Sequence, residues 1–336
     1  MTALLSTPSQ RLIGLLLCIA LTAAGIVFSI ALGVTPIGWR TVLESYTAFN
    51  GSTEQLIIHT ARMPRALIAA VVGASLATAG ALMQAITRNP LASPSIFGIN
   101  SGASLFIVIA AAYFNVSGLS AFAWIAFAGA AFSSGLVYVL GSIGKDGLTP
   151  IKITLAGASL TAFFLSLTQG ILLSSGKAFD QVLYWLVGSV AGRDLGILLS
   201  ILPYTAAAMV GLTLLARHMN ILSLGDDVAK GLGQQTVYVK IAAGVLIVIL
   251  AGGSVAAAGP IAFVGIIIPH LTRYLVGRDY RWVLPYCAFL GAILLLAADI
   301  CSRYIAMPKE IPVGVMTAVI GVPFFVYIAR KGAADR

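Results

Sequence analysis

A run of 18 residues without a charged side chain, residues 66–83, sets the fold class of this chain. Such a run is about long enough to cross a hydrocarbon core of roughly 30 Å as a helix. Arg62-Met-Pro-Arg65 precedes it. Proline suits the first turn of a helix, because it lacks only a donor that is unpaired there anyway. A polar corner at residues 88–94 follows, and a second apolar run begins at once. The pattern predicts a tight hairpin of two membrane-spanning helices.

Comparable apolar runs recur along the whole chain. Hydrophobic residues make up 59% of the 336 positions and charged residues only 9%, whereas a soluble domain typically carries about 25% charged residues. A soluble protein of this composition would expose too much apolar surface to stay dispersed. The runs are continuous and do not alternate with polar positions, which excludes a barrel. The sequence therefore predicts an all-α polytopic membrane protein.

Ten of the runs are predicted to be transmembrane helices, although the eighth is slightly short for a span. They are residues 12–34, 66–83, 95–113, 119–140, 151–173, 195–215, 239–258, 261–276, 283–301 and 312–329. The first run exceeds the 7–15 apolar residues of a signal peptide, so a spanning helix is favoured over a cleaved leader. The apolar segment 182–190 is too short to cross and is predicted to be a surface or re-entrant helix. We expect one transmembrane domain over residues 1–336.

The charges predict the orientation. Ten spans place both termini on one side, and with the termini in the cytoplasm thirteen of the twenty Lys and Arg residues lie inside and seven outside. An inside excess is typical of membrane proteins. The basic residues are scattered singly, which argues against a nucleic-acid partner. Four of the outside residues fall in two groups next to span ends, which indicates an external partner; the seven are Arg40, Arg62, Arg65, Lys177, Arg193, Arg303 and Lys309.

The sequence shows no pattern typical of an enzyme or a metal site. The three cysteines and three histidines lack the spacing of metal ligands. The segment 170–178 resembles a phosphate-binding loop only superficially, because its glycines are six apart where five are needed and Ala178 replaces the required Ser or Thr. Nucleophile-elbow and zinc-protease patterns are absent. We expect no catalysis, no metal and no cofactor bound by this chain.

One acidic residue lies inside an apolar run. Asp299 and Arg303 are four apart near the end of the ninth span, so they share a helix face and can pair. A carboxylate at membrane depth costs about 2.5–3.5 kcal/mol on insertion scales. The two interpretations are a structural ion pair and a proton or ion site. The second would suit an ion-coupled secondary transporter, although such proteins usually show a relay of charged residues or broken helices.

The longest polar stretch of the second half, residues 217–238, contains two short amphipathic pieces broken by glycine. Asp226, Asp227 and Lys230 form a polar edge, and Leu222, Val228 and Leu232 are apolar. An interfacial helix resting on lipid headgroups is one interpretation. Because two adjacent carboxylates suit a negatively charged lipid surface poorly, a cytoplasmic segment that contacts another protein is favoured.

A series of short phrases, in order over residues 55–330, is similar to the FecCD-type permeases of binding-protein-dependent ABC importers. These importers carry ferric siderophores, haem or cobalamin. The phrases are Arg62-Met-Pro-Arg65, Gly73-Ala-Ser-Leu-Ala77, Gly80-Ala-Leu-Met-Gln84, Arg88-Asn-Pro-Leu-Ala-Ser-Pro94, Gly98-Ile-Asn-Ser-Gly-Ala103, Leu224-Gly-Asp-Asp-Val-Ala229, Leu232-Gly233, Gly259-Pro-Ile-Ala-Phe-Val-Gly265, Pro269-His270, Arg273, Ala298-Asp299, Arg303, Glu310-Ile-Pro-Val-Gly314 and Gly321-Val-Pro323.

The resemblance implies a type II ABC importer permease in the bacterial plasma membrane. It implies a second permease subunit (identical or a sister chain), two cytoplasmic ATPase subunits that hold ATP and Mg, and an extracytoplasmic substrate-binding protein. Arg62, Arg65 and Arg303 match outer-rim arginines that pair with glutamates of the binding protein. A further rim arginine found in some members has no counterpart between residues 55 and 61.

The resemblance also assigns the cytoplasmic segment. The residues that match coupling helices, which fit a cleft on the ATPase, are Leu222, Leu224, Gly225, Asp226, Asp227, Ala229, Leu232 and Gly233. The fifth span, the short helix after it and the tenth span would line the central route. Iron arrives inside its chelate, so the chain needs no metal ligands. The phrases at residues 96–100 and 224–234 favour a ferric siderophore over haem or cobalamin.

Overall fold

The computed structural model describes residues 3–116, 118–144, 149–175, 182–183, 185–307 and 309–334, and every regular element within these ranges is a helix. In order these are α1 (Pro8–Ala31), α2 (Trp39–Thr47), α3 (Thr53–Ile57), a π-helical turn (Ile58–Arg62), α4 (Met63–Thr87), a 3-10 turn (Pro94–Phe97), α5 (Ile99–Phe114), α6 (Leu119–Ser142), α7 (Pro150–Ser174), α9 (Leu195–Leu222), α10 (Asp226–Gly231), α11 (Thr236–Ala258), α12 (Val264–Val276), α13 (Tyr280–Tyr304) and α14 (Val313–Ala334).

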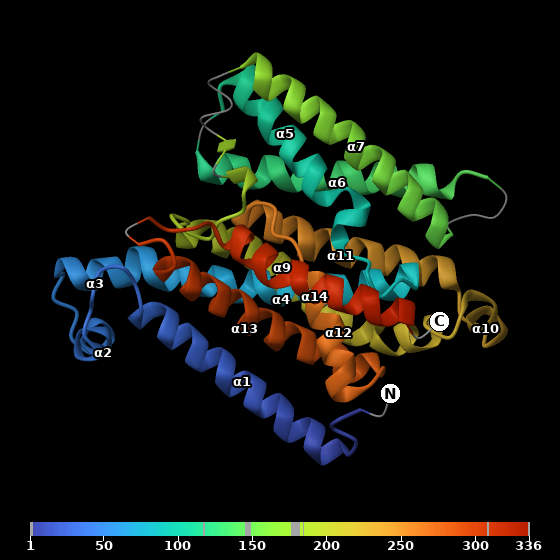
Figure 1. The fold of residues 1–336 in the computed structure, drawn as a ribbon, viewed down its shortest axis with the longest axis horizontal. Coiled ribbons are helices and arrows are strands. Elements are labelled where there is room, and N and C mark those ends of the chain that lie inside the picture. The colour runs from blue at the N-terminus through green and yellow to red at the C-terminus, as the bar shows by residue number, and fades with distance from the viewer. Residues whose placement is uncertain are drawn as a thin grey trace.

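The long helices extend from left to right in Figure 1, roughly along one common direction. Helices α5, α6 and α7 form a layer on one side of the bundle, α1 lies on the opposite side, and α4 lies between them among α9, α11, α13 and α14. Both chain ends lie at the end of the bundle that carries α10, and we call it the α10 end. Helices α2 and α3 lie at the opposite end of the bundle, which we call the α2 end.

Seven helical segments in the described residues are long and apolar enough to cross a membrane: α1, the continuous helix Thr53–Thr87, α6, α7, α9, α11 and α13. Three shorter apolar helices, Ile99–Phe114, Val264–Val276 and Val313–Ile328, accompany them. All ten coincide with predicted runs. The prediction of an all-α membrane protein with about ten apolar helices is confirmed.

The predicted hairpin after residue 62 is present. Pro64 lies in the first turn of α4, and α4 ends where Arg88 adopts a left-handed conformation with φ of 50°. A 3-10 turn from Pro94 to Phe97 then leads into α5. Several helix boundaries differ from the predicted runs by a few residues. Among them, α9 continues to Leu222 where the prediction ended at 215, and α12 begins at Val264, where the prediction began at 261, because Phe263 has φ of 69°.

Helix α4 forms the centre of the packing, since twenty of its residues are buried. Small residues let its neighbours approach to backbone contact, the usual packing mode where lipid removes the hydrophobic drive between helices. A Cβ placed on Gly80 would overlap the carbonyl group of Gly265 on α12, and one on Gly73 would overlap the carbonyl of Gly291 on α13.

The described part of the predicted re-entrant segment is short. Residues 182–183 and 185–186 are helical, and residues 188–190 are not. Residues 176–181 and residue 184 lie outside the described ranges, and with them the second glycine of the loop-like segment 170–178. The backbone at the end of this segment is fixed to α11 and α14. Ser189 N donates to Ala258 O at 2.7 Å, and Gly314 N donates to Gly188 O at 3.0 Å.

Candidate functional site

The α2 end holds a chain of four charged side chains. Asp299 of α13 is fully buried, and its Oδ2 accepts a hydrogen bond from Nη2 of Arg303. Arg65 of α4 approaches from the other side, with Nε 3.0 Å from Oδ1 and 3.1 Å from Oδ2. Nη1 of Arg65 also pairs with Oε2 of Glu310 at 2.6 Å. Both carboxylate oxygens of Asp299 are therefore engaged by cations, which is how a buried charge is made tolerable.

The predicted rim arginines differ in where their side chains point. Arg62 donates through Nη1 to the carbonyl oxygens of Ile30 and Ala31, at 3.1 and 2.8 Å. Arg303 donates through Nη1 to the carbonyl oxygens of Ser29 and Leu32, both at 2.6 Å. The last carbonyls of a helix have no partner within it, and the helix dipole favours a cation there.

As a result, two of the three arginines predicted to meet a partner lie inside the α2 end. Arg62 and Arg303 are buried and bind the end of α1. Arg65 keeps 12% of its side chain exposed. The sequence located all three at this end but gave no sign of the contact with α1, because the contact joins residues about 30 and 270 positions apart.

The α10 end carries the predicted segment 217–238. The first residues of that segment extend α9, and the last ones begin α11. Gly225, with φ of +124°, precedes α10, and Gly233, with φ of +80°, follows it. Leu222 and Ala229 are buried and hold α10 against the bundle. Leu224, Val228 and Leu232 are 63%, 50% and 63% exposed and form an apolar surface that no described residue covers.

The acidic pair of α10 divides between two environments. Asp226 pairs with Arg88 at the end of α4 (Nη2 to Oδ1, 2.7 Å) and with Lys240 of α11 (Nζ to Oδ2, 2.6 Å). Asp227 is exposed. The sequence predicted both as one solvated edge. Asp226 turns inward because Arg88, distant in the chain, lies next to it, and no local pattern shows that.

The pH dependence of this contact has a defined sign. Partial burial raises the pKa of Asp226, but the hydrogen bonds and charges of Lys240 and Arg88 outweigh it and hold the pKa below its ordinary value. The contribution of Asp226 to stability should therefore be full above about pH 4, its unfolded pKa, and be lost as pH falls through the lower folded value. Thermal unfolding of the purified chain and of Asp226→Asn from pH 7 to pH 2.5 measures this: the two curves should converge only below pH 4. Convergence already at pH 6 would contradict it.

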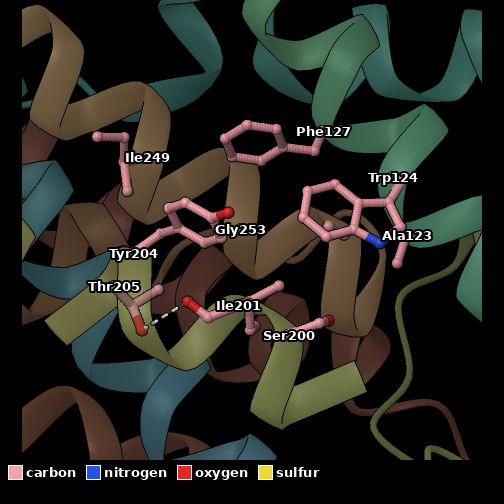
Figure 2. Close-up of a pocket in the computed structure, with 10 residues that line it drawn as sticks. Ala123, Trp124, Phe127, Ser200, Ile201, Tyr204, Thr205, Ile249 and Gly253 are labelled. Atoms are coloured by element: carbon pink, nitrogen blue, oxygen red, sulfur yellow. Dashed lines mark hydrogen bonds between the residues drawn. The ribbon is translucent and has the colours of Figure 1, made fainter. Parts of the chain in front are cut away.

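A cavity of about 240 Å³ lies between α6, α9 and α11. In Figure 2 the rings of Trp124, Phe127 and Tyr204 surround it, and a hydrogen bond joins Thr205 Oγ1 to the carbonyl of Ile201. The hydroxyl of Ser200 likewise donates within its own helix. Its walls thus offer mainly apolar surface, and exposed Trp and Tyr are typical of the membrane interface. We assign no charged ligand to this cavity.

The described residues contain no group of three or more His, Cys, Asp or Glu side chains that could hold a metal ion. Lys177, one of the predicted outside cations, lies outside the described residues.

Known transport proteins resemble this chain over nearly its whole length. The model of the FecCD transport family matches residues 21–331. The "Probable siderophore transport system permease protein YfiZ" of Bacillus subtilis is 55% identical over 325 residues, 97% of this chain and 98% of that protein. The "Fe(3+)-citrate import system permease protein YfmD" of the same organism is 46% identical over 325 residues, covering 96% of each chain. The "Ferric enterobactin transport system permease protein FepD" of Escherichia coli is 40% identical over 318 residues, 95% of this chain and 94% of that protein.

A solved structure shares the fold. Its title is "An inward-facing conformation of a putative metal-chelate type ABC transporter", and it matches with a TM-score of 0.82 and 28% sequence identity, over 94% of this chain and 98% of that one. The match extends over almost the whole length of both chains, and the family model covers most of the sequence. The chain is a member of the FecCD transport family.

Proposed function

We propose that this chain is the permease subunit of an ABC importer that carries ferric siderophores into the cytoplasm. The observation that carries the proposal is the near-full-length similarity, at 55% identity, to a protein named as a siderophore transport permease. Two further relatives are named for the import of ferric citrate and ferric enterobactin. Haem and cobalamin remain the alternative substrates.

The partners follow from the permease role. Two cytoplasmic ATPase subunits would hold ATP and Mg and supply the energy, so that this chain needs no nucleotide site of its own. An extracytoplasmic binding protein would deliver the chelate, and a second permease subunit, identical or a sister chain, would complete the route. The protein would sit in the bacterial plasma membrane with the α10 end and both termini in the cytoplasm, which agrees with thirteen basic residues there against seven outside.

A second subunit would cover apolar faces that the bundle leaves exposed. Leu155 and Phe163 of α7, and Val319 and Tyr327 of α14, are exposed apolar side chains in the described residues. Both helices belong to the predicted lining of the central route. A route between two such subunits would have mainly apolar walls, which suits a large chelate that crosses whole.

The binding protein would dock at the α2 end. Arg65 has exposed surface and would give the direct contact, while Arg62 and Arg303 would position this rim from beneath by holding the end of α1. Charge reversal of a buried arginine would disturb α1 as well as docking. Arg65→Gln would also remove a cation from buried Asp299 and lower the unfolding temperature. Arg65→Lys keeps a cation there without the guanidinium fork, so reduced capture of the binding protein by Arg65→Lys, with unchanged unfolding temperature, is the informative result.

The exposed apolar surface of α10 would fit the ATPase. Replacing Leu224 or Leu232 by Asp should reduce capture of the ATPase, and with it uptake, at least tenfold, because hydrophobic anchors dominate such interfaces. The unfolding temperature should stay unchanged, since each side chain is 63% exposed. Pull-down of the ATPase and transport-coupled ATP hydrolysis in membranes measure the effect.

The matched control for α10 is Leu43→Asp. Leu43 is 68% exposed on α2, so this variant adds the same charge at the opposite end. It should retain full ATPase capture. Normal capture by the Leu224 and Leu232 variants would remove α10 from the coupling role.

The decisive test of the function is uptake in cells that lack this gene. Labelled ferric siderophores, haem and cobalamin would be supplied to the deletion strain, with and without the wild-type chain. Siderophore uptake that disappears with the deletion and returns with the chain is the expected result. A deficit confined to the uptake of haem or cobalamin would show that this compound, and not a ferric siderophore, is the substrate. The absence of any uptake deficit would overturn the proposal.

A further inference from the structure

A second cavity, of about 400 Å³, lies at the α2 end and is unlike the apolar one. The start of α6, the backbone after residue 185 and the loop before α14 form its walls. Its polar lining residues are Ser189, Arg193 and Glu310, together with the indole of Trp185. This volume lies within the range of small-molecule sites, but it holds only part of a large chelate.

Two side chains that line this cavity each carry a donor nitrogen without an acceptor among the described residues. Arg193 is only 4% exposed, and its Nη1 is buried without a hydrogen-bond partner. Trp185 is 3% exposed, and its Nε1 is also buried without a partner. An unmade hydrogen bond to a buried donor carries the full penalty of its desolvation, and a buried cation without a counterion carries more. Both residues line the same cavity, so an acceptor with negative charge held there would satisfy two donors that are otherwise unpaired.

The carboxylates near Arg193 in the described part of the chain are already engaged. Glu310 pairs with Arg65 at 2.6 Å. Asp194 accepts the backbone N–H of Ile197 at 3.0 Å and begins α9. Arg193 itself donates through Nε to the carbonyl of Ser189 at 3.2 Å. Burial lowers the pKa of Arg193 to about 10, which still leaves it protonated at neutral pH.

The wall that carries both donors is fixed before any ligand arrives. Besides the hydrogen bonds of Ser189 and Gly314, the backbones approach so closely that a Cβ on Gly259 would overlap the carbonyl of Trp185. A Cβ on Gly314 would overlap the carbonyl of Val187. A site that needs no ordering on binding loses less entropy, so a weak anionic group can be held there.

We propose that Arg193 and Trp185 bind an anionic oxygen group of the ferric chelate as the chelate enters from the α2 end. The preferred group is a carboxylate. The guanidinium fork matches the geometry of a carboxylate, and the indole N–H adds one further donor. The site would therefore favour negatively charged chelates over neutral ones. This inference rests on the proposed permease function and names a specificity site for it.

Direct binding tests the proposal without transport. The full chain in lipid nanodiscs would be titrated with iron-55 ferric citrate, which is anionic, and with an uncharged iron-55 ferric trihydroxamate. Arg193→Gln should weaken binding of ferric citrate about tenfold or more and change that of the trihydroxamate less than twofold. Trp185→Phe keeps an aromatic ring but removes the donor, and should weaken ferric citrate about threefold. Arg40→Gln, which removes an exposed arginine on α2, should change neither.

Several outcomes would overturn the site. Equal binding of ferric citrate by wild type and Arg193→Gln, both with normal unfolding temperature, removes it, as does a wild-type chain that binds neither chelate. If Arg193→Gln leaves chelate binding intact but weakens capture of the ligand-free binding protein, the anion is an acidic side chain of that partner and the proposal is wrong.

Uptake separates this inference from the proposed function. If the wild-type chain restores ferric-chelate uptake to the deletion strain and Arg193→Gln restores it equally, only the subsite fails. If the wild-type chain restores no ferric chelate, the proposed function fails. Binding of iron-free citrate in nanodiscs, lost in Arg193→Gln, would then still demonstrate the anion site.

Discussion

Replacement of Gly80 by leucine should nearly abolish folded protein in the membrane. The α-carbon of Gly80 faces the backbone of Gly265 so closely that even a Cβ would overlap it, and the obstacle is backbone that cannot rotate away. Overpacking of a core with flexible neighbours costs about 1–3 kcal/mol. Here α4 and α12 would have to separate. We therefore expect most of the packing between these two helices to be lost, and with it most of the folded protein.

The natural control is Gly135→Leu. Gly135 of α6 is exposed, and no atom lies within 4 Å of the position that a Cβ would take there, so a side chain fits. Membrane abundance and size-exclusion profiles in detergent would compare the two variants with wild type. A Gly80→Leu chain of normal abundance and normal unfolding temperature would refute the close crossing.

Replacement of Asp299 by alanine should destabilise the chain by about 3–5 kcal/mol, the range for removing one member of a buried ion pair. Arg303 is buried and would lose the carboxylate that pairs with it, whereas Arg65 would keep Glu310. Thermal or denaturant unfolding of the purified chain measures the loss. Glu44→Ala, which breaks the exposed pair with Arg40, should cost no more than about 1 kcal/mol.

The same residue decides between the two classes of transporter. An ion site needs a carboxylate free to exchange its ion, and Asp299 instead has arginines on both oxygens. Loss of uptake in Asp299→Asn with unchanged stability, normal docking and no need for ATP would favour the ion-coupled alternative. Loss of stability together with uptake supports the structural role.

The sequence predicted the helices well because each span must be long, uncharged and apolar throughout, and this is visible locally. The hairpin after Arg62 was equally accessible, since proline and the polar corner mark its turn. The predicted end of α9, at residue 215, was wrong by seven residues. Arg217 and His218 are exposed while Met219 is buried, so the helix continues as an amphipathic one beyond the point where its apolar run stops.

The sites were predicted as locations but not as contacts. Asp299 and Arg303 are visible as a pair because they lie one helical turn apart, whereas Arg65 reaches Asp299 across 234 residues. Arg193 appeared only as one of seven outside cations. What distinguishes it, a buried nitrogen without an acceptor in the described residues, depends on walls from three separate parts of the chain.

Helix α4 has a charged contact at each extremity, Arg65 with Asp299 and Arg88 with Asp226. The two arginines are 23 positions apart, Arg65 in the first turn of α4 and Arg88 directly after its last residue, which at 1.5 Å per residue corresponds to about 35 Å. A helix of this length, buried on nearly all sides, behaves as a stiff rod. A shift of α10 along the axis of α4 would therefore arrive at the opposite face of the membrane almost undiminished and without any intermediate loop.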